Sequence, residues 1–139
     1  MNYKILLFST LIGVCLCSKA TIAQTATKVH QSFTLSDIKN ITIDIPYPYT
    51  IETWEGNTIL LETSIDIDNA PPTLVKMFLK AGRYEVIQQL ENKTMRYNLQ
   101  SMSRKGVLTS KGACIEKIEM HFLVPEKVSV KTLGAFVSK

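Results

Sequence analysis

Few residues in this 139-residue chain have the type and spacing that catalysis needs. Cys114 and His121 could form a nucleophile–base pair, but an odd number of positions separates them, so an unbroken strand would place them on opposite faces. No local signature of a catalytic cysteine surrounds Cys114. We therefore expect Cys114 to be a structural thiol, since a free cysteine behaves as a small hydrophobic residue.

The histidines, His30 and His121, show no metal-ligand pattern. Neither has a histidine, cysteine or acidic residue nearby at the spacing of a metal site. His121 shares the alternation of Lys117 and Glu119, which is the solvent-facing set of its strand. We expect two surface histidines, with no metal and no cofactor.

Asp66 and Asp68 share one face of a predicted strand, as a catalytic carboxylate pair or two Ca²⁺ ligands would. No glycine-containing Asp/Asn loop completes a calcium site, so a solvated strand end is the better interpretation. The chain also lacks a P-loop, a nucleophile elbow and a His-Glu-x-x-His motif. We expect no catalytic residues and no enzyme; the alternative is a secreted hydrolase with an unrecognised active site.

Three aromatic residues cluster in sequence, and aromatics are common anchors of binding surfaces. Tyr47 and Tyr49 keep the parity of the isoleucines before them, which favours the core over a ligand platform. Trp54 lies in a predicted turn, where core and binding roles are equally supported. It is the one candidate binding aromatic.

Period-two alternation dominates the elements that must position these residues, and it predicts β-strands. The alternating runs are 41–51, 59–67, 84–90, 95–99 and 118–124, with a further strand starting at Val128. The short Trp54–Asn57 link favours a β-hairpin between the first two runs. Glu91-Asn92-Lys93 predicts a turn.

One helix interrupts the strands at about 72–81. Leu74, Val75, Phe78 and Leu79 fall on one helical face, and Gly82 is a suitable C-terminal stop. We therefore expect Phe78, at the centre of that face, to be buried. The fold class is mainly β, with antiparallel strands or a short β-solenoid or stacked sheets, plus this one amphipathic helix.

The N-terminus predicts export. A short charged start precedes an apolar run of about 13 residues, 5–17, which is too short to span a bilayer and suits a signal peptide cleaved between Ala23 and Gln24. The predicted organisation is a signal peptide at 1–23, a polar segment at 24–32 and a single β-rich domain at 33–139. The mature chain would be periplasmic, on the outer-membrane surface or extracellular, with no stable membrane span.

Removing the leader changes both the charge and the cysteine content. Lys4 and Lys19 leave with it, which lowers the formal net charge from +4 to +2 and argues against nucleic acid as a partner. Cys15 and Cys17 leave too, so Cys114 has no disulfide partner within the mature chain. Acylation of Cys15 or Cys17, as in a lipoprotein, is disfavoured. The residues just before them, Val14 and Leu16, are larger than the small residue that such processing prefers.

The stretches 33–43 and 51–62, with their Thr53-Trp54-x-x-Asn57 motif, resemble the opening of the auto-transporter adhesin head family, the GIN domain. The likeness extends to adhesin-like exported proteins of Bacteroidetes and covers about 30–130. It implies a β-solenoid or stacked-sheet fold and no catalytic residues. We expect a non-catalytic binding, adhesin-like or structural module of the cell envelope, with a protein or glycan ligand.

Two predictions concern strand edges. Pro46 and Pro48 share one parity, so the segment 41–51 should be an edge strand around them or bend there. The β-prone end at 128–138 has no proline that would block pairing with another strand. Either the chain is a shortened form of a longer protein, incomplete at its C-terminus, or this edge pairs with another chain, and we expect self-association through 128–138.

Overall fold

The computed structural model describes residues 26–100 and 105–137. The predicted leader, with Cys15, Cys17 and the cleavage site at Ala23 and Gln24, lies outside the described residues. The described part contains no helix long and apolar enough to cross a membrane.

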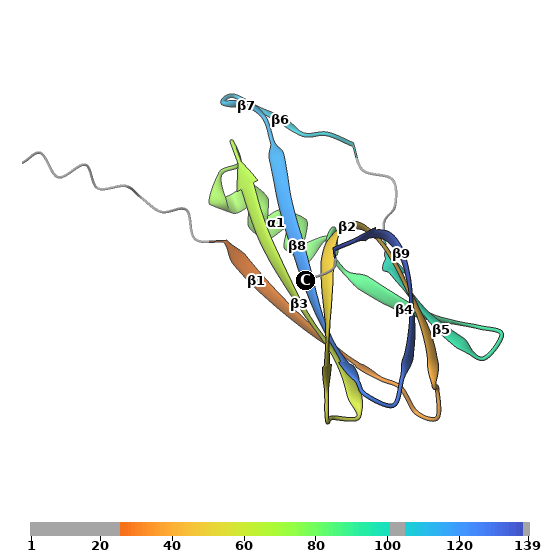
Figure 1. Ribbon diagram of the computed structural model, residues 1–139. Coiled ribbons are helices and arrows are strands. Elements are labelled where there is room, and N and C mark those ends of the chain that lie inside the picture. Colours follow the sequence, from red (N-terminus) through yellow and green to blue (C-terminus); the bar gives the residue numbers. More distant parts are fainter. Residues whose placement is uncertain (1–25, 101–104, 138–139) are drawn as a thin grey trace, which may run out of the picture.

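The fold is mainly β, as predicted (Figure 1). The elements in chain order are β1 (Thr27–Thr34), β2 (Asn40–Trp54), β3 (Thr58–Asp68), α1 (Pro72–Lys80), β4 (Val86–Glu91), β5 (Thr94–Leu99), β6 (Leu108–Thr109), β7 (Gly112–Ala113), β8 (Ile115–Pro125) and β9 (Ser129–Phe136). β6 and β7 form a small separate pair. Residues 27–32, which the sequence leaves in a polar segment, belong to β1.

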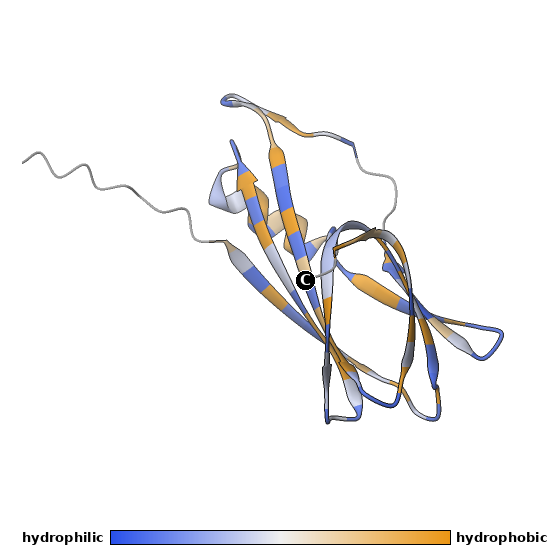
Figure 2. Cartoon of the chain, viewed as in Figure 1, coloured by the Kyte–Doolittle hydropathy of each residue, from blue (hydrophilic) through white to orange (hydrophobic). Residues whose placement is uncertain are grey.

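The large sheet is mixed, and it curls into a nearly closed, barrel-like shape. Its strand order is β1-β3-β8-β2-β5-β4, and β9 also pairs with β2. β2 is parallel to β5, β8 and β9, whereas the β1–β3, β3–β8 and β4–β5 pairs are antiparallel. Inward apolar and outward polar residues alternate along the strands (Figure 2).

The predicted hairpin between β2 and β3 is wrong. The turn at 54–57 is present, but β8 lies between the two strands, antiparallel to β3 and parallel to β2. The turn therefore joins two strands that do not pair. Local turn residues favour a hairpin but carry no information about a strand about 60 residues further along the chain.

β2 bends sharply at its prolines, as predicted. The Lys39 carbonyl accepts from the Ser129 N–H, and the Trp54 carbonyl accepts from the Glu126 N–H. The three residues from 126 to 129 span at most about 11 Å, whereas a straight strand of the length of β2 would extend about 50 Å. The two ends of β2 can meet the same short loop only because β2 folds back, and its register with β9 shifts between Ile45 and Tyr49.

β9 follows β2 around this bend, and Gly134 makes the close approach possible. Gly134 has φ +75°, and a Cβ there would lie 2.2 Å from the carbonyl oxygen of Ile45. The Tyr49 hydroxyl lies inside the bend, and its one proton is shared between the carbonyl oxygens of Leu133, at 2.7 Å, and Ile43, at 3.1 Å. Burial raises the pKa of Tyr49, which keeps the hydroxyl protonated as a donor.

The core lies inside the curled sheet, and α1 covers part of it. Tyr49, Tyr97 and Phe122 are its largest fully buried side chains, so the core assignment of Tyr49 is confirmed. Phe78 is 6% exposed, which confirms that the helix buries this residue. The Arg83 guanidinium lies 4.7 Å from the centre of the Phe78 ring. Burial raises the pKa of Tyr97 to about 12.

Candidate functional site

Three loops meet at the lower end of the domain in Figure 1, and Trp54 lies among them. They connect β1 to β2, β2 to β3 and β8 to β9. Together they line a shallow depression with these residues: Leu35, Ser36, Asp37, Ile38, Lys39, Trp54, Glu55, Gly56, Asn57, Pro125, Glu126, Lys127 and Val128. The sequence placed Trp54 in a turn, but it did not show that two distant loops would join it.

The Trp54 side chain is fixed by its own turn. Its indole Nε1 donates to the Thr58 carbonyl at 3.0 Å. The ring lies against Gly56 so closely that a Cβ at that position would be 2.2 Å from the ring carbons. Any larger residue at Gly56 would displace the indole. Trp54 nevertheless keeps part of its surface exposed, so it can contact a ligand in a preset orientation.

Backbone hydrogen bonds fasten the other two loops. The Ile38 N–H donates to the Leu35 carbonyl at 3.0 Å, and the Val128 N–H donates to the Pro125 carbonyl at the same distance. The Ser129 and Glu126 N–H groups also bond to the two ends of β2, so the base of the depression is held in place.

The rim of the depression is exposed and carries both signs of charge. Its acidic residues are Asp37, Glu55 and Glu126, and its basic residues are Lys39 and Lys127. Such a rim around a partly exposed aromatic can offer hydrogen bonds to a polar ligand while the indole supplies apolar contact area. It does not have the single-sign charge that would select a highly charged polymer.

The histidines lie on a different surface, the outer face of the sheet. His30, Glu62, His121 and Thr50 are in register on β1, β3, β8 and β2 and form one row across four strands. His30 Nε2 lies 3.0 Å from Glu62, and Lys28 donates to the same carboxylate at 2.7 Å. The hydrogen bonds from Lys28 and then His30 lower the pKa of Glu62.

His121 has its own partners in this row. Its Nδ1 lies 2.8 Å from the Thr50 hydroxyl oxygen, and its Nε2 lies 3.4 Å from a Glu52 carboxylate oxygen. The parity of His121 with Glu119 predicted this outward position. The row itself could not be predicted, because its members come from strands that are not consecutive. In the described residues, no three His, Cys, Asp or Glu side chains are grouped so that they could hold a metal ion.

The structure does not bring Cys114 to His121. Cys114 precedes β8, and the separation of seven positions corresponds to about 23 Å of extended strand. The Cys114 sulfur lies 3.8 Å from the Asn69 carbonyl oxygen instead. Asp68, from the predicted carboxylate pair, forms an ion pair with Lys117 at 2.8 Å.

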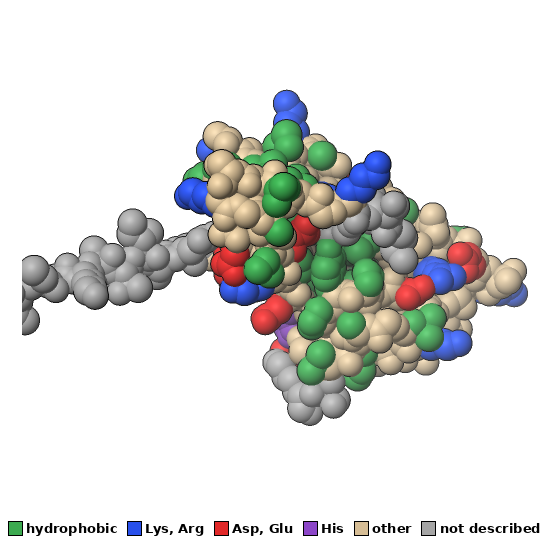
Figure 3. Space-filling view, turned by 90° about the horizontal axis from the view of Figure 1, so that it is seen from above, with side chains coloured by type: hydrophobic (Ala, Val, Ile, Leu, Met, Phe, Trp, Pro, Cys, Tyr) green, Lys and Arg blue, Asp and Glu red, His purple; other side chains and the backbone are tan. Residues whose placement is uncertain are grey.

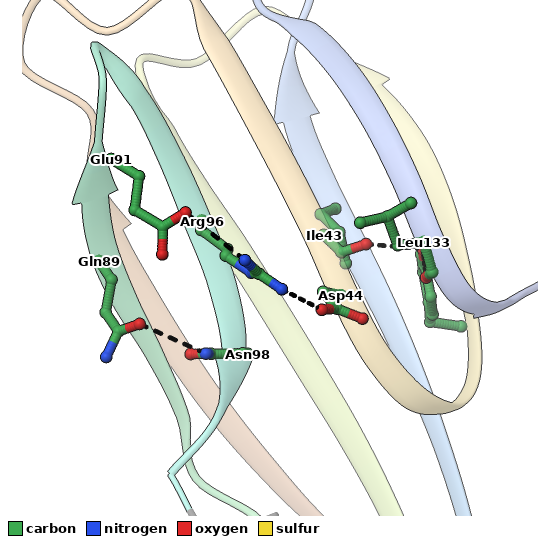
Figure 4. A network of polar contacts seen from close by, with 8 residues as sticks. Ile43, Asp44, Gln89, Glu91, Arg96, Asn98 and Leu133 are labelled. Atoms are coloured by element: carbon green, nitrogen blue, oxygen red, sulfur yellow. Dashed lines mark hydrogen bonds and ion pairs between the residues drawn. The ribbon is translucent and has the colours of Figure 1, made fainter.

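A second polar network lies on the outer face around β5 (Figure 4). Arg96 forms ion pairs with Asp44 of β2 and, at 3.5 Å, with Glu91 of β4. Asn98 donates to Gln89 at 3.4 Å. These contacts join neighbouring strands, which gives their residues a structural role. The Trp54 depression is the candidate binding site because it combines a fixed, partly exposed aromatic with polar groups on its rim.

No protein-family model matches this chain, and no curated protein matches it significantly. The chain is similar in structure to one described as a "putative cell adhesion protein from Clostridium sporogenes ATCC 15579", with 7% sequence identity and a TM-score of 0.46. The match covers 78% of this chain and 46% of the other, so this chain spans less than half of that protein's length. A likeness at this level carries no argument about function.

Proposed function

We propose that this chain is an exported, non-catalytic binding module that contacts a protein or glycan ligand through the three-loop depression around Trp54. The observation that carries the proposal is the fixed, partly exposed indole within a rim of mixed charge. The resemblance to the adhesin head family in the residues around Trp54 agrees with it. Export rests on the leader alone, and the mass of the secreted protein should correspond to a chain that starts at Gln24.

Trp54 is the single tryptophan of the chain, so intrinsic fluorescence reports on this depression alone. Protein purified from cells that express the full chain would be screened on a glycan array and against immobilised envelope proteins. We expect any ligand found to shift the Trp54 emission on titration. An Asp37→Ala/Glu126→Ala double variant should bind at least about tenfold more weakly, which corresponds to about 1.4 kcal/mol.

The matched control is Lys93→Ala, an exposed change in the β4–β5 turn, which should leave affinity unchanged. Binding that survives both the double variant and Trp54→Phe would place the ligand elsewhere. Turnover of a bound ligand would instead favour the hydrolase alternative.

A further inference from the structure

β9 forms an open edge of the sheet. Among the described strands of the large sheet, β1, β4 and β9 each pair along one side only. The edges of β1 and β4 are joined at one position, where the Gln31 side chain of β1 hydrogen-bonds both backbone groups of Val86 in β4. Among residues 26–100 and 105–137, no backbone hydrogen bond joins β9 to a strand on the side away from β2.

The outward groups of β9 can be identified from its pairing. Ser129 donates its backbone N–H to the Lys39 carbonyl at 2.8 Å. Successive residues of a strand direct their N–H and C=O groups to alternate edges, so those of Val130 and Thr132 are directed away from β2. The strand is also held at its far end, where the Val137 N–H donates to the Tyr49 carbonyl at 2.9 Å. The outer edge is therefore fixed in an extended geometry.

The side chains of β9 give this edge little protection against pairing. Natural edge strands are usually guarded by charges, prolines or a covering segment. β9 contains one charge, Lys131, and no proline. Leu133, Phe136 and the adjacent Val137 are exposed, at 38%, 42% and 48%. Figure 3, which looks down on the bend of β2 and β9, shows hydrophobic side chains gathered at this end of the molecule.

We propose that β9 pairs with β9 of a second copy of this chain, antiparallel, about a twofold axis close to Thr132. A second copy presents the same unprotected β9 edge, so the two edges can pair with each other, and the contact is isologous. This proposal is independent of the ligand site at Trp54.

The charge on β9 selects the register. Outward-directed residues must lie opposite one another to exchange hydrogen bonds, so the axis passes close to Thr132 or Lys131. An axis at Lys131 would place two lysines directly opposite each other, which is unfavourable. An axis at Thr132 places each Lys131 opposite Leu133 of the second copy, where the lysine stem can cover the exposed leucine. The close approach at Gly134 limits the pairing to a short stretch, so the dimer should dissociate on dilution.

Sedimentation of protein purified from cells that express the full chain tests this proposal. The parent should shift from monomer to dimer as its concentration rises. Thr132→Pro removes an N–H from the outer edge but none from the β2 side, and it should be monomeric. Thr132→Ala keeps the N–H and should still dimerise.

Leu133→Lys and Leu133→Glu test the register at an exposed site where folding is not at risk. Leu133→Lys should weaken dimerisation about tenfold because two like-charge contacts are created, and Leu133→Glu should strengthen it at low salt. A parent that stays monomeric at its solubility limit would overturn the proposal. So would equal dimerisation of the lysine and glutamate variants, or a folded Thr132→Pro variant that dimerises like the parent.

Discussion

The side-chain amide of Gln31 binds the backbone of Val86 as a neighbouring strand would. Its Nε2 donates to the Val86 carbonyl at 3.0 Å, and its Oε1 accepts from the Val86 N–H at 3.1 Å. A single side chain thus connects β1 to β4, the two strands at the ends of the barrel-like sheet. The same end of the core is closed by the edge-to-face contact of Phe33 with Tyr97, whose ring centres are 5.1 Å apart.

Gln31→Leu should therefore destabilise the domain by about 1–3 kcal/mol, because Val86 is buried and its backbone groups would lose their partners. Urea denaturation measures the change. Gln88→Leu, at an exposed position on β4, is the control and should change stability little. Equal stability of Gln31→Leu and the parent would show that the connection between β1 and β4 does not depend on this residue.

Phe78→Ala should cost about 3–5 kcal/mol of unfolding free energy, because the ring is buried at the centre of the α1 contact. Met77→Ala removes a neighbouring side chain that is 57% exposed and should cost much less. Thermal unfolding of the two variants gives the comparison. If both variants unfolded with the parent, α1 would be a surface feature.

Gly134→Ala should destabilise the domain and loosen β9. The φ of +75° disfavours any side chain, and a Cβ would collide with the Ile45 carbonyl oxygen. Hydrogen exchange should then be faster in β9 than in the parent. Gly106→Ala is the matched control, since a Cβ there meets no atom within 4 Å. Unchanged protection of β9 in Gly134→Ala would contradict the close approach.

The contacts of Glu62 with Lys28 and His30 should make the stability of the fold depend on pH. Lys28 and His30 lower the pKa of Glu62 in the folded state below its ordinary value. The ionised carboxylate therefore stabilises the fold above its ordinary pKa, and this contribution is lost as pH falls through the lowered pKa. The stability difference between the parent and Glu62→Gln should shrink steadily in acid, and high salt should reduce it at neutral pH. A difference that is constant across this range would rule out the pairing.

Local patterns predicted the local features of this fold. The apolar face of α1, the burial of Phe78 and the bend at Pro46 and Pro48 follow from periodicity and backbone chemistry within a few residues. The β4–β5 turn is the same case, since Asn92 and Lys93 adopt the positive φ angles, 48° and 66°, of a tight hairpin.

Pairing between distant strands was not predictable in this way. The insertion of β8 between β2 and β3 depends on parallel register with β2, which leaves no mark in a window of a few residues. For the same reason the sequence could name Trp54 but not the loops that surround it. The closure by Gln31 also has no local signal, because a polar residue in a strand is ordinarily solvent-facing.

The meeting of three loops beside the start of β9 has a consequence for any assembly of this protein. Val128 lines the depression, and Ser129 begins β9 directly after it. Two copies joined by antiparallel β9 strands would therefore carry their tryptophans at opposite poles. The two ligand sites of such a dimer could not bind one flat surface at the same time, so dimerisation would add no avidity there. The dimer would act as a cross-bridge, holding one surface at each pole.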